Sequence, residues 1–120
     1  MLRISASQLD AFRRQRGVDF LVRAIRFLRE SFAEYREVPD DAMKAAIGGF
    51  IERAMSYGLE SEIQIVSFVL AAHYFGGDFD LKNASFHKTL SGPEQTPEWK
   101  ANWLEAMCLL VEGKRERGEL

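Results

Sequence analysis

The stretch YGLESEIQIVSFVLAAHYFGGDFD, residues 57–80, decides the fold of this chain. Ser61 and Gln64 have the spacing of a capping box, in which each side chain satisfies a free backbone N–H of the other at a helix start. The residues that follow leave no polar face until two glycines interrupt the run, and a helix that is apolar all round is buried on every side. We therefore predict a central helix over residues 61–75, covered by other helices.

Two helices are predicted before this central one. Apolar residues spaced by three and four predict one long helix over residues 6–36, which starts at a capping box of Ser5 and Gln8 and can bend near Gly17. A second helix is predicted from Asp40, as its N-cap, to a C-terminal turn at Gly58. The pair Gly48-Gly49 within it costs helix stability, so we expect another group to pack close to its backbone.

Two more helices are predicted after the central one. A short helix is expected around residues 82–90, and Phe79 is expected to enter the core. Thr96 as N-cap and Pro97 as first helical residue start the last helix. Its predicted buried face is Trp99, Trp103, Met107 and Leu110. The sequence thus predicts an all-α bundle of about five helices in a single domain, 1–120, with a frayed tail at 113–120.

Length and composition fit a soluble globular domain. The chain has 120 residues, of which 47% are hydrophobic and 28% charged, and its only cysteine, Cys108, excludes an intrachain disulfide. The N-terminus lacks the apolar region of a secretory signal, and no apolar run reaches the length that spans a bilayer. We expect a cytoplasmic protein that does not bind membranes.

The net charge of −2 hides an uneven distribution. Residues 1–36 carry 8 Lys and Arg against 4 Asp and Glu, whereas residues 37–112 carry 5 against 12. A basic first helix on an acidic body can steer a partner, or the two charges can pair within the molecule.

The segment HYFGGDFD raises the question of a metal or catalytic site at His73, Asp78 and Asp80. An EF-hand loop starting at Asp78 needs an oxygen ligand at its fifth position, glycine at its sixth and Glu at its twelfth, and this chain has Lys82, Asn83 and Thr89 there. We interpret the two glycines as a helix stop and the two aspartates as caps of the next turn. His73 is expected at the core boundary, His87 on the surface and Cys108 in an inert, buried position. No catalytic, metal or cofactor residue is predicted.

Candidate partner-binding residues lie on the first and last helices. Arg16, Arg23, Arg26 and Arg29 form an arginine stripe on the first predicted helix, which can be a solvated helix face, a surface for an acidic protein or a nucleic-acid site. The isoelectric point of 5.7 disfavours nucleic acid. The two tryptophans can be core residues or, where exposed, binding anchors. The predicted partner-binding set is Arg16, Arg23, Arg26, Arg29, Trp99 and Trp103.

The centre of the chain resembles a group of small helical bacterial proteins encoded beside type VI secretion effectors and spike components. Their pattern runs A-x-x-Y-G-[IL]-x-[ST]-E, an apolar helix, then F-G-x-D-F-D. The matching residues are Ala54, Tyr57, Gly58, Leu59, Ser61 and Glu62, followed by Phe75, Gly76, Asp78, Phe79 and Asp80; Gly77 departs from the pattern.

The resemblance implies an accessory role without catalytic residues. The expected function is a non-enzymatic adaptor or chaperone that binds a type VI secretion effector or spike component. The first alternative is an immunity protein that neutralises a toxin. A small enzyme using His73, Asp78 and Asp80, and a nucleic-acid binder using the arginine stripe, are the further alternatives.

Overall fold

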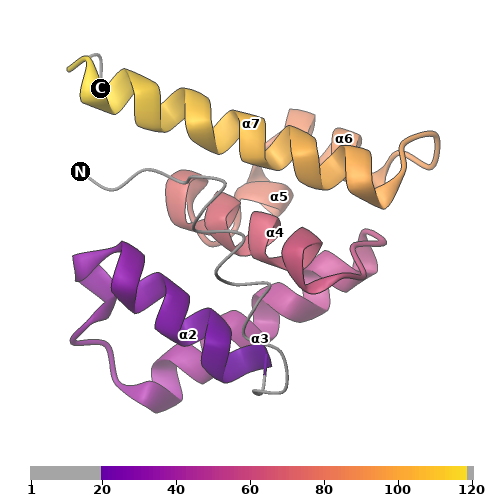
Figure 1. Ribbon diagram of the computed structural model, residues 1–120. Helices are drawn as coiled ribbons and strands as arrows, with labels where there is room; N and C mark the ends of the chain where they lie inside the picture. Colours follow the sequence, from indigo (N-terminus) through magenta and orange to yellow (C-terminus); the bar gives the residue numbers. More distant parts are fainter. Residues whose placement is uncertain (1–19, 119–120) are drawn as a thin grey trace.

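The computed structural model of the chain describes residues 20–118 and shows an all-α architecture there, with no strand among these residues. Figure 1 shows α4 in the middle of the helices, with α7 on one side and α2 and α3 on the other. The predicted all-α fold class is confirmed. The elements are α2 (Phe20–Ser31), a 3-10 helix η1 (Ala33–Tyr35), α3 (Asp40–Ser56), α4 (Glu62–Phe75), α5 (Phe79–Lys82), α6 (Ala84–Ser91) and α7 (Pro97–Glu116).

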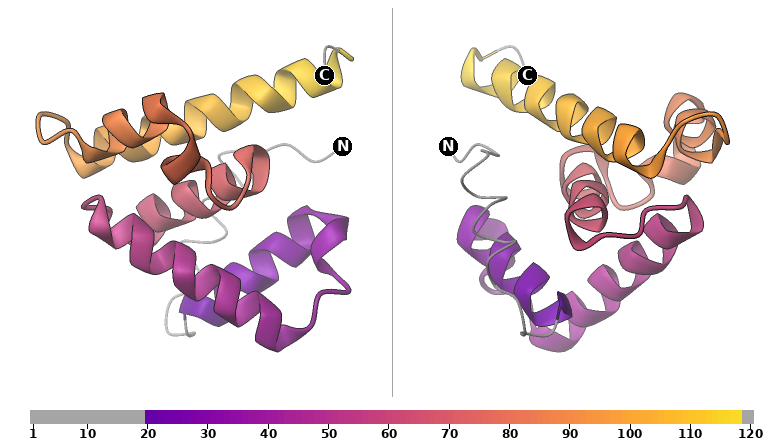
Figure 2. Two further views of the ribbon diagram at one scale, coloured as in Figure 1. Left: turned by 180° about the vertical axis from the view of Figure 1, so that it is seen from behind. Right: turned by 45° about the vertical axis from the view of Figure 1, so that its right-hand side comes forward.

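The central helix α4 is the one predicted from its lack of a polar face. Residues 65–72 are all buried, including Ser67, whose hydroxyl donates to the Ile63 carbonyl 3.1 Å away. The predicted capping box is confirmed, since the Ser61 hydroxyl accepts from the Gln64 N–H at 3.2 Å and the Gln64 side chain accepts from the Ser61 N–H at 3.2 Å. Helices α3, α5 and α7 pack against α4, and the further views in Figure 2 show the same order.

The turn between α3 and α4 ends α3 as the glycine predicts. Gly58 has φ +91°, which strains any residue with a Cβ. Its N–H donates to the Met55 carbonyl at 3.0 Å, and the Leu59 N–H donates to the Ala54 carbonyl at 3.1 Å, which is the Schellman arrangement. Leu59 is then fully buried. At the other end, Pro39 is the N-cap and Asp40 the first helical residue, so α3 starts one position earlier than predicted.

Two predictions about the first half of the chain are wrong. The helix predicted to continue to residue 36 ends at Ser31 and is followed by η1, because Phe32 has an extended backbone. A Cβ added at Gly48 or Gly49 would have no atom of the described residues within 4 Å, so no group within residues 20–118 packs close to that backbone. The helix start near residue 6, the Ser5–Gln8 box and the bend at Gly17 lie outside the described residues.

The short helix predicted around residues 82–90 is α6, and a further short helix that was not predicted, α5, precedes it, with Asn83 between the two. The Asn83 backbone is extended, and its side chain caps α6 by accepting from the N–H groups of Ser85 and Phe86 at 3.0 and 3.2 Å. Phe79 enters the core as expected. Its ring lies 5.0 Å from that of Phe68 and 5.2 Å from that of Phe86, so both short helices are held to α4 by aromatic contacts.

Helix α7 starts as predicted, but its predicted buried face is only partly right, since Trp103 and Met107 are partly buried against the core whereas the other two residues are exposed. Thr96 caps it by accepting from the Trp99 N–H at 3.1 Å, and Pro97 follows. Trp99 is 42% exposed and Leu110 is 57% exposed. The buried face includes two charged residues, which an apolar pattern does not reveal. It consists of Lys100, Ala101, Leu104, Cys108 and Glu112.

The two charged residues on this buried face have polar partners. The Lys100 ammonium donates to the Tyr57 carbonyl at the end of α3, 3.0 Å away, and Glu112 accepts from the Tyr74 hydroxyl at 3.0 Å. Helix α7 continues to Glu116, into the segment for which fraying was predicted. None of the helices within residues 20–118 combines the length and the apolar character needed to cross a membrane.

The central position of α4 predicts a clear difference between two leucine truncations. Leu70 is 1% exposed, so Leu70→Ala is expected to lower the free energy of unfolding by about 2–5 kcal/mol through lost burial and a cavity. Leu81→Ala, at a residue 63% exposed, is expected to change it by less than about 0.5 kcal/mol. Denaturant unfolding followed by circular dichroism measures both, and equal losses would contradict the central placement of α4.

Candidate partner-binding groove

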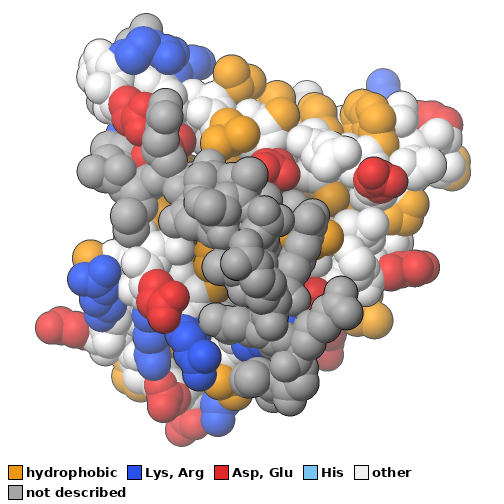
Figure 3. All heavy atoms as spheres, viewed as in Figure 1, with side chains coloured by type: hydrophobic (Ala, Val, Ile, Leu, Met, Phe, Trp, Pro, Cys, Tyr) orange, Lys and Arg blue, Asp and Glu red, His pale blue; other side chains and the backbone are white. Residues whose placement is uncertain are grey.

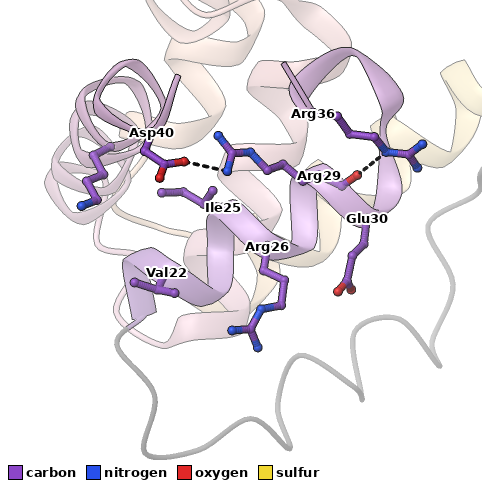
Figure 4. Close-up of a pocket in the computed structure, with 8 residues that line it drawn as sticks. Val22, Ile25, Arg26, Arg29, Glu30, Arg36 and Asp40 are labelled. Carbon is purple, nitrogen blue, oxygen red and sulfur yellow. Dashed lines mark hydrogen bonds and ion pairs between the residues drawn. The ribbon is translucent and has the colours of Figure 1, made fainter. Parts of the chain in front are cut away.

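An open groove of about 620 Å³ lies between α2 and the start of α3. Figure 4 shows its lining side chains, which come from α2, the loop after it and the first turns of α3. Val22 and Ile25 give it an apolar part, and four basic residues outnumber two acidic ones around it. The charged lining residues are Arg26, Arg29, Arg36, Lys44, Glu30 and Asp40.

Arg29 holds the wall of the groove together. Its guanidinium donates to the carbonyls of Tyr35 at 3.2 Å and Val38 at 2.6 Å, and to the Asp40 carboxylate at 2.7 Å. Arg36 in turn donates to the Arg29 carbonyl at 3.0 Å. These bonds fix the loop that joins α2 to α3, and they occupy the Arg29 donors within the protein.

Arg26 and Lys44 are the two basic groups of the groove whose side chains make neither a hydrogen bond nor an ion pair within residues 20–118. Both are exposed, and neither forms an ion pair within residues 20–118. Figure 3 shows basic side chains gathered over the part of the molecule that contains α2, with acidic ones interspersed. The groove therefore offers two solvated cations beside an apolar surface, a combination suited to a carboxylate-bearing polypeptide.

Arg23 does not belong to this exposed surface. Its side chain is 3% exposed and forms a two-pronged ion pair with Glu62 at the start of α4, with one nitrogen 2.6 Å from a carboxylate oxygen. The guanidinium also lies over the Phe20 ring, 5.8 Å from its centroid. Arg23 thus joins α2 to α4, which corrects the prediction of a partner-binding role for this residue.

The predicted tryptophans lie on the other side of the molecule. Figures 1 and 2 show α2 and α7 on opposite sides of α4, so the structure does not bring the arginines and tryptophans together. The rings of Trp99 and Trp103 are stacked with centroids 6.3 Å apart, and Trp103 packs on Phe86 at 5.2 Å. Arg16 lies outside the described residues.

The segment HYFGGDFD does not form a joint site. Asp80 is 0% exposed and is bound by Arg53, and by the Tyr57 hydroxyl at 2.7 Å, so its predicted role as a cap is wrong. Asp78 is exposed, 3.7 Å from the Lys82 ammonium, and as N-cap of α5 it makes no side-chain cap bond. No group of three or more metal-ligating side chains is assembled within the described part of the chain.

The Asp80 carboxylate remains ionised because of its partners. Burial by itself would raise its pKa, but the hydrogen bonds from Arg53 and Tyr57 hold the pKa below its ordinary value. Arg53 also donates to the Gly77 carbonyl at 2.6 Å and lies 5.6 Å from the centroids of the Phe50 and Phe68 rings. This network ties α3 to the turn after α4, so it is structural.

His73 lies at the core boundary, as predicted, and its contacts are separate from those of Asp78 and Asp80. Its ring stacks on Phe32 at 3.8 Å, and its Nδ1 is 2.6 Å from the Tyr35 hydroxyl. Burial lowers the pKa of His73, opposed by Glu34 and Glu112 and reinforced by Arg115. The pKa of Tyr35 is raised to about 12, chiefly by burial. The pair therefore fastens η1 to α4.

Cys108 and His87 lie where the sequence predicts them, in the core and on the surface. Cys108 is fully buried, and burial raises the pKa of its thiol to about 12, which keeps it unreactive at neutral pH. His87 is exposed.

Comparison with known proteins leaves the resemblance without support. No protein-family model, curated protein or solved structure matches this chain.

Sequence reasoning missed Arg36 and Lys44 in the groove. Both lie close to Pro39, where the charged stretch 34–44 surrounds a helix break. A cluster of charges on both sides of a proline turn was the available signal, because such a turn brings the end of one helix beside the start of the next.

The Asp80 network predicts unequal effects of two isosteric substitutions. Asp80→Asn leaves Arg53 partly desolvated without its counter-charge, so the free energy of unfolding is expected to fall by about 2–3 kcal/mol. The matched control, Asp78→Asn, removes only an exposed pair and is expected to cost about 0.5 kcal/mol or less. Urea unfolding at neutral pH measures both; a small loss for Asp80→Asn would show that the network does not hold α3 in place.

The lowered pKa of His73 predicts a stability change in mild acid. Because the unfolded chain binds a proton near pH 6.5 and the folded one at lower pH, stability is complete above 6.5 and falls as the pH decreases below it. His73→Gln is expected to flatten this dependence, whereas His87→Gln, at an exposed residue, leaves it unchanged. Thermal unfolding from pH 7.5 to 5 gives the slopes, and an unchanged slope in His73→Gln would refute the assignment.

Proposed function

We propose that this protein is a non-enzymatic accessory protein that binds an acidic segment of a partner protein in the groove between α2 and α3. The observation that carries the proposal is the placement of Arg26 and Lys44, both exposed and without ion pairs among the described residues, beside the apolar side chains of Val22 and Ile25. Such a groove binds carboxylates at its rim and an apolar side chain between them.

The internal bonds of the groove favour binding with little rearrangement. Arg29 and Arg36 hold the loop before α3 through side-chain bonds to carbonyl groups, so the loop is already ordered before a partner arrives. Preorganised surfaces lose less conformational entropy on association. The two available cations contribute to the encounter rate and to specificity more than to the final affinity.

The proposed role is that of an adaptor or chaperone for a type VI secretion effector or spike component. Only the resemblance of the motif around α4 supports this choice of partner. The alternative role is an immunity protein, in which the same basic groove would cover an acidic surface of a toxin. Neutralisation of toxicity in a cell that expresses both proteins distinguishes immunity from delivery.

Catalysis and nucleic-acid binding have weaker support. The catalytic arrangement considered from sequence requires His73, Asp78 and Asp80 to act together, and each of them has separate partners here. Two acidic residues, Glu30 and Asp40, lie among the cations of the groove and repel a phosphate backbone. The isoelectric point of 5.7 also disfavours nucleic-acid binding.

Charge reversal in the groove tests the proposal. A partner is first identified by affinity purification from the native cell with mass spectrometry, and its binding to the purified chain is then measured by calorimetry. Arg26→Glu combined with Lys44→Glu is expected to weaken binding about tenfold or more, because both cations then repel an acidic segment. Added salt is expected to weaken the wild-type complex in the same direction.

Lys88→Glu is the matched control, since it reverses an exposed charge on α6, outside the groove. It is expected to leave the affinity unchanged. The proposal fails if no stoichiometric partner is recovered, or if the double reversal binds as tightly as the wild type.

A further inference from the structure

The ion pair of Arg29 and Asp40, called the groove pair below, is held firmly on one side only. The Asp40 side chain is 72% exposed and that of Arg29 is 28% exposed. Within residues 20–118, the single hydrogen bond of the Asp40 carboxylate is the one from Arg29, at 2.7 Å. Arg29 also donates to the backbone carbonyls of Tyr35 and Val38. The guanidinium is therefore fixed by the loop, and the carboxylate is the one partner that can leave without moving the backbone.

Two other arginine pairs of the described chain are closed to such an exchange. Arg23 is buried and contacts both carboxylate oxygens of Glu62. Asp80, the partner of Arg53, is fully buried. The groove pair instead borders an open space of about 620 Å³, and Figure 4 shows its two side chains reaching toward each other from α2 and α3. A ligand can therefore reach this guanidinium without opening the core.

We propose that Arg29 binds a carboxylate of the partner's acidic segment and that Asp40 occupies the position of that carboxylate until the partner arrives. This inference rests on the proposed function and names the contact that it needs. The incoming carboxylate displaces Asp40 into solvent, so the partly buried guanidinium keeps a counter-charge throughout. The displacement costs little, because a carboxylate as exposed as that of Asp40 gains little from its ion pair.

The surroundings of Arg29 favour an acidic side chain that has an apolar neighbour. Val22 and Ile25 line the same groove, and Val22 is 41% exposed. Arg26 from α2 and Lys44 from α3 place a further positive charge on each helix. The groove therefore has a fixed donor, two solvated cations and an apolar surface for one segment of a partner.

Asp40 also contributes to specificity. A neutral or basic segment cannot supply the counter-charge that Arg29 loses when Asp40 leaves, so it gains nothing from displacing Asp40. Discrimination against a wrong partner through such an unpaired charge is a common source of specificity. The groove pair therefore admits an acidic segment and rejects others.

Removal of the Asp40 charge tests the inference. The probe is a fluorescein-labelled peptide that alternates glutamate with leucine, and its binding to the full chain is measured by fluorescence anisotropy. Asp40→Asn is expected to tighten binding about fivefold or more, because the peptide no longer competes with a carboxylate for Arg29. The same peptide with glutamine in place of glutamate is expected to bind neither protein.

Asp41→Asn is the matched control. Asp41 is exposed and lies in the same first turn of α3, but it does not line the groove. Its substitution changes the net charge and the charge near the helix N-terminus as much as Asp40→Asn does. It is expected to change the affinity less than about twofold, because solvent and salt screen a charge outside the groove. Circular dichroism checks that both variants fold.

Carbon NMR of the side-chain carboxyl groups detects the displacement directly. Addition of the glutamate peptide to the wild type is expected to shift the Asp40 resonance toward that of a solvated aspartate and to leave the Asp41 resonance unchanged. The Arg29 Nε–H signal is expected to persist, because the Tyr35 carbonyl still accepts from it.

Two results would overturn the inference: equal effects of Asp40→Asn and Asp41→Asn on the affinity, or an Asp40 resonance that the peptide leaves unchanged. The proposed function survives either result if the wild type binds the glutamate peptide and the combined Arg26→Glu and Lys44→Glu variant does not. If neither the wild type nor Asp40→Asn binds the peptide, the groove is not a carboxylate site, and the inference and the proposed function fail together.

Discussion

Residues 65–72 of α4 are buried without interruption, so this helix has to be covered around its whole circumference. The hydrophobic effect drives that covering, and the arrangement of the other helices follows from it. Helix α3 covers one side, α7 another, and the aromatic residues of α5 and α6 cover the C-terminal end. Even the one hydroxyl in this stretch, that of Ser67, is satisfied by its own helix.

Buried charges fix how the covering helices are oriented. Arg23 binds Glu62 at the start of α4, and Arg53 binds Asp80 just beyond its end. Lys100 donates to the carbonyl of Tyr57, the C-cap of α3, where the helix dipole is negative. Apolar contacts alone allow a helix to slide or rotate, whereas a buried charge is stable only opposite its partner. Each of these bonds therefore selects one position of a helix.

The two surfaces on opposite sides of α4 differ in chemistry. The groove between α2 and α3 is a mixed surface of cations and small apolar residues, which suits a transient, salt-sensitive complex. The outer side of α7 is more apolar, with Trp99, Leu109 and Leu110 exposed to solvent. Helix α4 lies between the groove and α7, so neither surface covers the other.

The sequence by itself determined the all-α fold, the central helix and the turns at Gly58, Ser61 and Thr96, because these depend on local backbone bonds and on a continuous apolar run. It misplaced part of the buried face of α7, because Lys100 and Glu112 are buried only through partners that lie far away in the chain. It grouped Arg23 with Arg26, although one is paired with α4 and the other exposed. Only the tertiary structure decides which charged side chains pair within the molecule and which stay exposed for a partner protein. Pairing depends on the distance between side chains in space, which the sequence does not give directly.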